Sequence, residues 1–128
     1  MIKVILADVV NATETFNKIM GQTFKGSLAF KIARLARELN KEMETFNEER
    51  RKLIMKYGKK DENGEYITDE NGNIRFDSDD LMKVNEEFTA LLQNEIEINA
   101  EKIPIGDIDN FEITPQEMLN VEKFFDFE

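Results

Sequence analysis

The apolar positions between residues 28 and 57 follow a single helical period. No Gly or Pro interrupts this stretch, and apolar side chains recur at steps of three and four residues, which predicts one amphipathic helix from Leu28 to Tyr57. Ser27 is a suitable N-cap before it, and Gly58 is a suitable C′ residue after it. A helix of about 30 residues is roughly 45 Å long, which exceeds the width of a small domain. We therefore expect one of its ends to project or to pack on another chain.

Four apolar residues of this helix keep a strict seven-residue spacing, and Arg50 fills the one gap in the stripe to which they belong. A stripe with this spacing is typical of a helix that packs along another helix. We therefore predict that it binds a protein partner, most simply a second copy of the chain. The four predicted binding residues are Ile32, Leu39, Phe46 and Leu53.

Shorter elements precede and follow the long helix. The apolar run of residues 2–6 predicts a strand, whose partner is either residues 95–98 or residues 111–113. A short helix should follow, starting at Asp8 or Asn11.

Two further helix starts appear in the second half of the chain. Asp77, with Asp80 three residues later, predicts a helix to about residue 94, after which residues 95–98 either form a strand or extend the helix. The sequence Thr114-Pro115-Gln116-Glu117 combines an N-cap, Pro at the first helical position and a capping-box acid, and so predicts a last helix.

A short repeat lies between the long helix and Asp77. The sequence Asp-Glu-Asn-Gly of residues 61–64 recurs at residues 69–72, and β-prone residues surround the second copy. Asn-Gly favours the positive φ of hairpin turns, so we predict a β-hairpin in which Ile67 and Ile74 share one face. The predicted fold class is therefore α+β and helix-dominated, with one long helix, two to three shorter helices and a β-hairpin in a single domain, residues 1–128.

Charge is distributed unevenly along the chain. Residues 1–60 carry thirteen Lys/Arg against seven Asp/Glu, a net +6, whereas residues 61–128 carry four against twenty, a net −16. We describe these as a basic helical half and an acidic hairpin and helix half of the one domain. Oppositely charged halves must contact different neighbours, or each other, and this favours an interaction protein over a uniformly solvated domain.

The residue inventory argues against most enzyme mechanisms. The chain has no Cys and no His, so it lacks the usual thiolate and imidazole metal ligands and the commonest general base. Neither Asp-Glu-Asn-Gly turn fits the register of a calcium-binding EF-hand loop, and Asp77, Asp79 and Asp80 suit a helix N-terminus. We expect no catalytic residue, no cofactor and no metal; an enzyme that uses carboxylates alone to bind a metal is the weakest alternative.

The long helix also carries a row of basic residues off its apolar stripe. Lys31, Arg34, Arg37 and Lys41 could bind phosphate, but acidic residues alternate with them and the chain carries a net charge of −10. A solvated face, or one docked on acidic residues, is the better interpretation, and direct nucleic-acid binding is not expected. No apolar run approaches the roughly 18 residues of a membrane helix, so no membrane partner is expected.

The C-terminus is rich in Phe. Phe124 and Phe127 can lie with Val121 on one face of the last helix. They either close the core or anchor the terminus in the groove of a neighbour, and we count both Phe residues among the predicted protein-binding positions.

Three stretches carry a resemblance to a known group of proteins. They are residues 53–58 (LIMKYG) at the end of the charged helix, residues 60–65 (KDENGE) in the following turn, and residues 113–119 (ITPQEML) near the C-terminus. In this order they are similar to a family of small uncharacterised proteins of bacteriophages and prophages of Gram-positive bacteria. The resemblance implies a product in the cytoplasm of the bacterial host, free or incorporated in a virion, and assigns no role to any residue.

The sequence thus leads to two functional hypotheses. The first is a non-catalytic, phage-encoded accessory or assembly protein that binds a phage or host protein, and a second copy of itself, through the long helix. The alternative is an acidic inhibitor whose carboxylates imitate a nucleic-acid backbone in the groove of a host nucleic-acid enzyme or defence nuclease.

Overall fold

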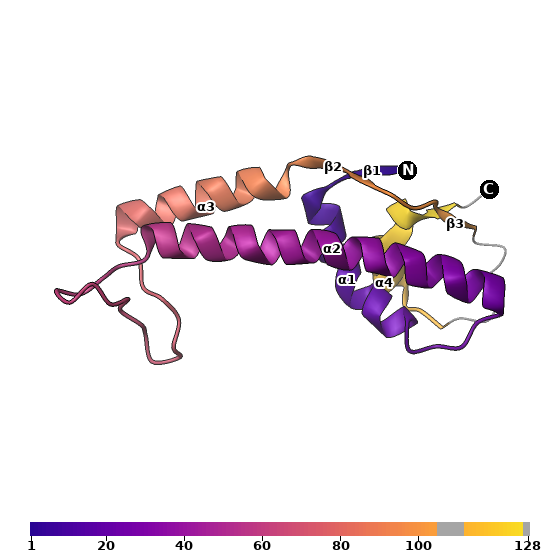
Figure 1. The fold of residues 1–128 in the computed structure, drawn as a ribbon, viewed down its shortest axis with the longest axis horizontal. Helices are drawn as coiled ribbons and strands as arrows, with labels where there is room; N and C mark the ends of the chain where they lie inside the picture. The colour runs from indigo at the N-terminus through magenta and orange to yellow at the C-terminus, as the bar shows by residue number, and fades with distance from the viewer. Residues whose placement is uncertain (105–111, 127–128) are drawn as a thin grey trace. The chain divides into compact units, whose positions relative to one another are not determined.

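The computed structural model describes residues 1–104 and 112–126 (Figure 1). It confirms a helix-dominated α+β fold with one long helix. Contacts group the chain into two compact units: unit 1 comprises Met1–Glu44 and Gln93–Glu128, and unit 2 comprises Thr45–Leu92. The long helix α2 (Gly26–Tyr57) begins in unit 1 and ends in unit 2.

The boundaries of the units do not follow the uneven charge of the sequence. Unit 1 carries nine Lys/Arg against fifteen Asp/Glu, a net −6, and unit 2 carries eight against twelve, a net −4. Both units are therefore acidic, and the basic and acidic halves divided at residue 60 are not separate structural bodies.

In unit 1, strands β1 (Ile2–Ile5) and β2 (Glu95–Ile98) form an antiparallel pair, with Ile2 opposite Ile98. This confirms the N-terminal strand and selects residues 95–98 from its two expected partners. Side chains alternate along β1, since Ile2 and Val4 are buried and Lys3 is exposed.

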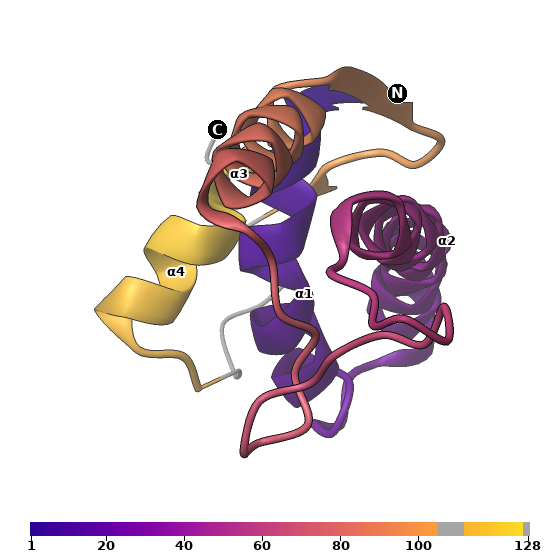
Figure 2. The ribbon, with the colours of Figure 1, turned by 90° about the vertical axis from the view of Figure 1, so that its left-hand side faces the viewer.

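Helix α1 (Leu6–Ile19) follows β1 directly and begins earlier than the expected Asp8 or Asn11. The Ile5 N–H donates a hydrogen bond to Asp8 Oδ2 at 3.0 Å. Asp8 therefore caps the helix from inside its first turn, and Ile5 is the boundary residue. Helix α4 (Pro115–Val121) lies beside α1, as Figure 2 shows.

The C-terminal end of unit 1 is not the continuous helix that we predicted. Helix α4 ends at Val121, a 3₁₀ turn η2 (Glu122–Phe124) follows, and strand β4 (Phe125–Asp126) pairs in parallel with β3 (Ile103–Pro104). The change of direction brings two consecutive rings onto Phe16 of α1: Phe124 edge-to-face at 5.9 Å and Phe125 stacked at 6.0 Å between centroids. This aromatic cluster lies at the centre of the core of unit 1.

Helix α2 confirms the predicted long helix, although its start differs by two residues. It begins at Gly26, so Ser27 lies inside the helix and is not its N-cap. The Lys25 carbonyl accepts the first i,i+4 hydrogen bond, from the Ala29 N–H at 2.8 Å. The part of α2 in unit 1 buries Leu28, Ile32, Leu35, Ala36 and Leu39.

In unit 2, helix α3 (Ser78–Leu92) runs back along the end of α2 (Figure 1). It ends two residues short of the expected Asn94, because residues 95–98 pair with β1. The Phe46 ring of α2 meets the Phe88 ring of α3 at 5.6 Å between centroids, and Lys56 pairs with Glu87 at 3.5 Å.

The two Asp-Glu-Asn-Gly turns between α2 and α3 are structurally equivalent. In each, the Asp Oδ1 accepts hydrogen bonds from the backbone N–H groups two and four residues later. Gly64 and Gly72 have φ of 79° and 81°, as predicted for Asn-Gly turns. Thr68 pairs with Ile74, and so the expected sharing of a face by Ile67 and Ile74 is wrong by one residue of register.

Three backbone segments close a ring of hydrogen bonds at steps of eight residues. The Lys59 N–H donates to the Arg75 carbonyl (2.7 Å), the Arg75 N–H to the Ile67 carbonyl (2.8 Å), and the Ile67 N–H to the Lys59 carbonyl (2.8 Å). The structural repeat therefore has three members, centred on Lys59, Ile67 and Arg75. The Asp-Glu-Asn-Gly sequence occurs only twice, after the first and the second of them.

The residues that precede the members of the ring are also eight apart: Gly58, Tyr66 and Ile74. A Cβ on Gly58 would lie 2.8 Å from Ile74 Cγ2 and 2.9 Å from Tyr66 Cδ1. Gly58 does follow the helix as expected, but it has no positive φ and is not a left-handed C′ residue. It is required here because the other two side chains occupy the space that its own side chain would fill.

Candidate protein-binding surfaces

The predicted binding residues of the seven-residue stripe are part of the core of the chain. Ile32, Leu39 and Phe46 keep 6% or less of their surface, and Leu53 is half-buried. Phe124 is fully buried against Phe16, and Phe127 lies outside the described residues. The periodicity thus identified the apolar face correctly, but a partner could reach the buried positions only by displacing the core of the same chain.

The outward side of α2 in unit 1 carries the aromatic residue that the sequence analysis missed. Phe30 is two positions from buried Ile32, so its side chain lies about 200° away from that residue around the helix. It is 70% exposed, and Met1 nearby is 72% exposed. The two residues border a hollow of about 310 Å³ together with Lys31 and Arg34, and Glu101 also lines it. We call these four residues, Met1, Phe30, Lys31 and Arg34, the Phe30 surface.

The sequence did contain a signal for this surface. Phe30 falls off the apolar stripe and is followed by Lys31, whereas an aromatic ring of a simple core helix belongs on the stripe. An aromatic residue on the polar side of an amphipathic helix is therefore worth marking as a candidate contact.

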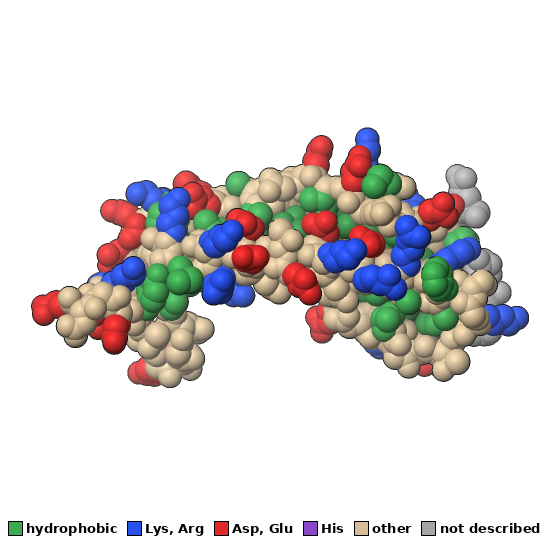
Figure 3. Space-filling model, viewed as in Figure 1, with side chains coloured by type: hydrophobic (Ala, Val, Ile, Leu, Met, Phe, Trp, Pro, Cys, Tyr) green, Lys and Arg blue, Asp and Glu red, His purple; other side chains and the backbone are tan. Residues whose placement is uncertain are grey.

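The cations of the Phe30 surface take no part in the ion pairs of residues 1–104 and 112–126. Among the described residues, no ion pair includes Lys31, Arg34 or Arg37, whereas Lys41 pairs with Glu38 at 3.0 Å. Figure 3 shows basic and acidic side chains alternating along α2, with apolar surface between them. The arrangement combines exposed apolar area with positive charges that are available to an acidic partner.

A second hollow continues this outward face of α2. Its volume is about 400 Å³, and its lining includes Met20, Ala33 and Arg37. Met20 is 47% exposed. Apolar contact points therefore occur on both sides of the basic row, which enlarges the area that a protein could cover.

A hollow of about 540 Å³ along β1 and β2 is a weaker candidate for binding. Its charged side chains include two ion pairs, Lys123 with Asp8 at 2.9 Å and Lys3 with Glu97 at 3.9 Å. Because these four charges are already compensated, a ligand would gain little by approaching them.

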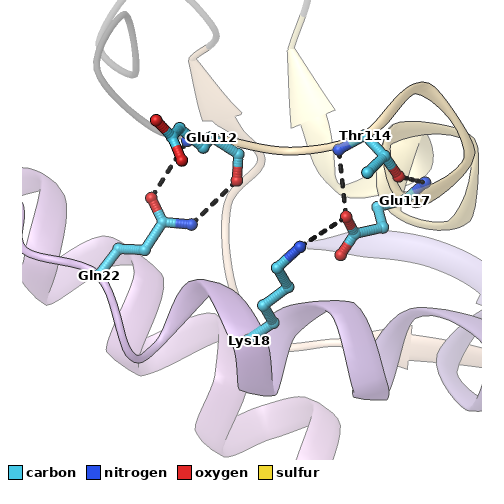
Figure 4. Close-up of polar contacts among 5 residues, drawn as sticks. All are labelled: Lys18, Gln22, Glu112, Thr114 and Glu117. Atoms are coloured by element: carbon cyan, nitrogen blue, oxygen red, sulfur yellow. Dashed lines mark hydrogen bonds and ion pairs between the residues drawn. The ribbon is translucent and has the colours of Figure 1, made fainter.

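Polar contacts fasten the residues that precede α4 to the end of α1 (Figure 4). The Gln22 side-chain amide donates to the Glu112 carbonyl at 3.0 Å and accepts from the Glu112 N–H at 3.2 Å. Lys18 Nζ lies 2.8 Å from Glu117 Oε1. Thr114 and Glu117 form the predicted capping box, with both hydrogen bonds at 3.1 Å. These contacts position α4 against α1.

The same contacts lower the pKa of Glu117 below its ordinary value of 4.5. The hydrogen bond from Lys18 is the largest cause, and the hydrogen bond from the Thr114 backbone is the next. The ionised form of Glu117 therefore stabilises the folded chain above pH 4.5, and this contribution is lost as the pH falls through the lowered pKa.

Replacing Glu117 with Gln should test this linkage. The variant keeps a side chain that can accept a hydrogen bond but loses the charge, so we expect a small decrease in Tm at pH 7, because Lys18 is 56% exposed and solvent screens the pair. The difference in Tm between the wild type and E117Q should shrink as the pH falls below 4.5. Thermal melts followed by circular dichroism from neutral to acidic pH would measure it.

Glu122 supplies the matched control for that experiment. It follows α4 directly and makes no ion pair with any of the described residues. Glu122→Gln should leave Tm unchanged at pH 7. A Tm difference for E117Q that stayed constant to low pH would contradict the assigned role of the charge.

The described part of the chain can also be compared with two other classes of site, a metal site and a membrane-spanning helix. Across residues 1–104 and 112–126, no three acidic side chains gather as ligands for a metal ion. None of the helices in these ranges has the length and apolar character needed to cross a bilayer. Comparisons of the chain with family models, with curated proteins and with solved structures give no match.

Proposed function

We propose that this chain is a non-catalytic protein-binding protein that engages an acidic partner through the Phe30 surface of α2. The observation that carries the proposal is Phe30 itself, 70% exposed and flanked by Lys31 and Arg34, which have no ion-pair partner among the described residues. The resemblance to phage proteins supports an activity in the cytoplasm of an infected bacterium, during virion assembly or the control of a host function.

Physical chemistry supports an interface at this position. An exposed Phe ring gains free energy when a partner removes it from water, and aromatic and Arg side chains supply much of the binding energy of protein interfaces. The adjacent cations favour an acidic partner and accelerate its approach. A nucleic acid is a poorer fit, because acidic residues alternate with the basic row along α2 and interrupt the run of cations that a phosphate backbone would need.

The alternative is an acidic inhibitor of a host nucleic-acid enzyme, and the repeated turns of unit 2 are the place to look for it. Their Asp61 and Asp69 carboxylates already accept backbone hydrogen bonds within the turn. Basic residues also flank the pair of turns, Lys59 before the first and Arg75 after the second. A mimic needs a dense array of available carboxylates, so these features give the alternative less support.

The test is affinity capture of the tagged full chain from lysate of a phage-infected Gram-positive host, with wild type and Phe30→Ser compared side by side. We expect F30S to reduce recovery of the main partner by about tenfold, as for a central interface residue. Leu119→Ser is the matched control, because Leu119 is 61% exposed but belongs to α4. It should recover as much partner as the wild type.

The outcomes separate the two functions. Loss of a capsid, portal or tail protein in F30S alone would support an assembly role at the Phe30 surface. Recovery of a host polymerase or nuclease that is insensitive to F30S would favour the inhibitor. Equal recovery of every partner by F30S and wild type would overturn the proposed surface.

A further inference from the structure

Unit 2 contains almost no core of its own. Of its residues, all of which the structure describes, Phe46 alone is a buried apolar residue, and α3 has no buried residue. The other buried apolar side chains all belong to unit 1. Leu81, Met82 and Met55 are instead between 46% and 64% exposed.

Two helices and a repeated turn cannot reach independent stability with so small a core. A helical hairpin buries one stripe of each helix, and a unit this small usually needs a disulfide, a metal or an added partner. The sequence has no Cys, which excludes a disulfide. No group of acidic side chains among the residues of unit 2, all of them described, could hold a metal ion, and so a protein surface is the addition that would bury its exposed apolar side chains.

Apolar side chains that remain partly exposed to solvent lie on one flank of the pair formed by α2 and α3. At about 100° per residue, Leu81 and Leu92 lie along one side of α3, and Phe88, whose ring contacts Phe46 of α2, lies at the inner edge of that side. On α2, Ile54 lies about 200° around the helix from Lys56, and therefore on the flank opposite to the Lys56–Glu87 pair. Leu81 is 46% exposed, and the other three are half-buried. We call these four residues, Ile54, Leu81, Phe88 and Leu92, the Leu81 face.

The opposite flank has a different character. There Lys56 pairs with Glu87 at 3.5 Å and also lies 4.9 Å from the centre of the Tyr57 ring. One flank of the hairpin is thus closed by charged groups of the same unit, and the other presents apolar side chains.

We propose that the Leu81 face binds the Leu81 face of a second copy, so that two hairpins form a four-helix bundle with two-fold symmetry. The charges of the helices identify the occupant as another copy. Without the Lys56–Glu87 pair of the opposite flank, the part of α2 in unit 2 carries three Lys/Arg and two Glu, a net +1, whereas α3 carries one Lys and three Asp/Glu, a net −2. A two-fold axis can place α2 of each copy on α3 of the other, which brings opposite charges together at both contacts.

This proposal is independent of the function assigned to the Phe30 surface, since the two sets of residues belong to different units. It also revises the self-association predicted from the stripe. The buried residues of that stripe pack inside the same chain. The proposed contact with a second copy is therefore the Leu81 face and not the stripe.

Sedimentation equilibrium of the full chain would test the proposal from about 1 to about 300 µM, a range wide enough to detect a modest association constant. We expect a monomer–dimer equilibrium for the wild type. Leu81→Glu should weaken it at least tenfold, because a charge would be buried in the apolar contact. Met82→Glu is the matched control: Met82 is the next residue of α3, is 64% exposed and lies off the face, so M82E should dimerise as the wild type does.

A second measurement keeps the test valid if L81E loses the helices of unit 2. The thermal midpoint of the wild type, followed by circular dichroism, should rise with protein concentration, because association stabilises the folded form. A wild-type chain that stays monomeric over the whole range would overturn the proposal and assign the Leu81 face to a different protein. Equal weakening by L81E and M82E would overturn the assigned face.

Discussion

Replacing Phe16 with Ala should destabilise unit 1 by about 4 kcal/mol, the largest effect that we expect from any single substitution. Phe16 keeps 1% of its surface and contacts both Phe124 and Phe125. The truncation removes a large buried apolar area and leaves a cavity where α1 meets the C-terminal segment. Urea denaturation followed by circular dichroism would measure the loss in the free energy of unfolding.

Phe30→Ala is the matched control, since it makes the same chemical change at a position that is 70% exposed. It should change the free energy of unfolding by less than about 0.5 kcal/mol. A loss for F30A as large as that expected for F16A would mean that Phe30 is covered in solution, which would contradict the Phe30 surface. A loss for F16A as small as that expected for F30A would contradict the aromatic core described for unit 1.

Adding one methyl group at Gly58 should destabilise unit 2 by about 2 kcal/mol, because the site has no room for it. The new Cβ would lie 2.8 Å from the Ile54 carbonyl oxygen and 2.8 Å from Ile74 Cγ2. The steric overlap can be relieved only if the turn repeat moves away from the end of α2. Hydrogen exchange should therefore accelerate at the backbone N–H groups of the ring, Lys59, Ile67 and Arg75.

Gly26→Ala provides the comparison, because a Cβ on Gly26 would meet nothing within 4 Å. Gly26 begins α2, and Ala has the higher helix propensity, so this variant should be as stable as the wild type or slightly more stable. If G58A were tolerated as well as G26A, the close packing of Gly58, Tyr66 and Ile74 would be wrong.

Features that depend on a few neighbouring residues were predicted well from the sequence. The capping box of Thr114 and Glu117 formed as expected, and so did the positive φ of Gly64 and Gly72. The long helix α2 also runs without interruption and ends at Tyr57, as predicted. Each follows from contacts within about five residues, and no distant part of the chain has to be known.

The turn repeat shows where local reasoning stopped. Two members were visible because their Asp-Glu-Asn-Gly sequences match. The third, at Arg75, leads into α3, and its membership rests on the backbone ring with Lys59 and Ile67. A hydrogen bond between backbones leaves little trace in residue type, so the complete ring required the tertiary structure.

The sequence by itself determined the helix-dominated α+β class, the position of the long helix and which of its faces is apolar, because periodicity and capping are properties of neighbouring residues. The tertiary structure decided what covers that face. It placed Ile32 and Leu39 in the core of unit 1, left Phe30 in solvent, and gave unit 2 two helices with little buried between them. Burial depends on which distant segments meet, and an apolar stripe is equally compatible with a core of the same chain and with the surface of another.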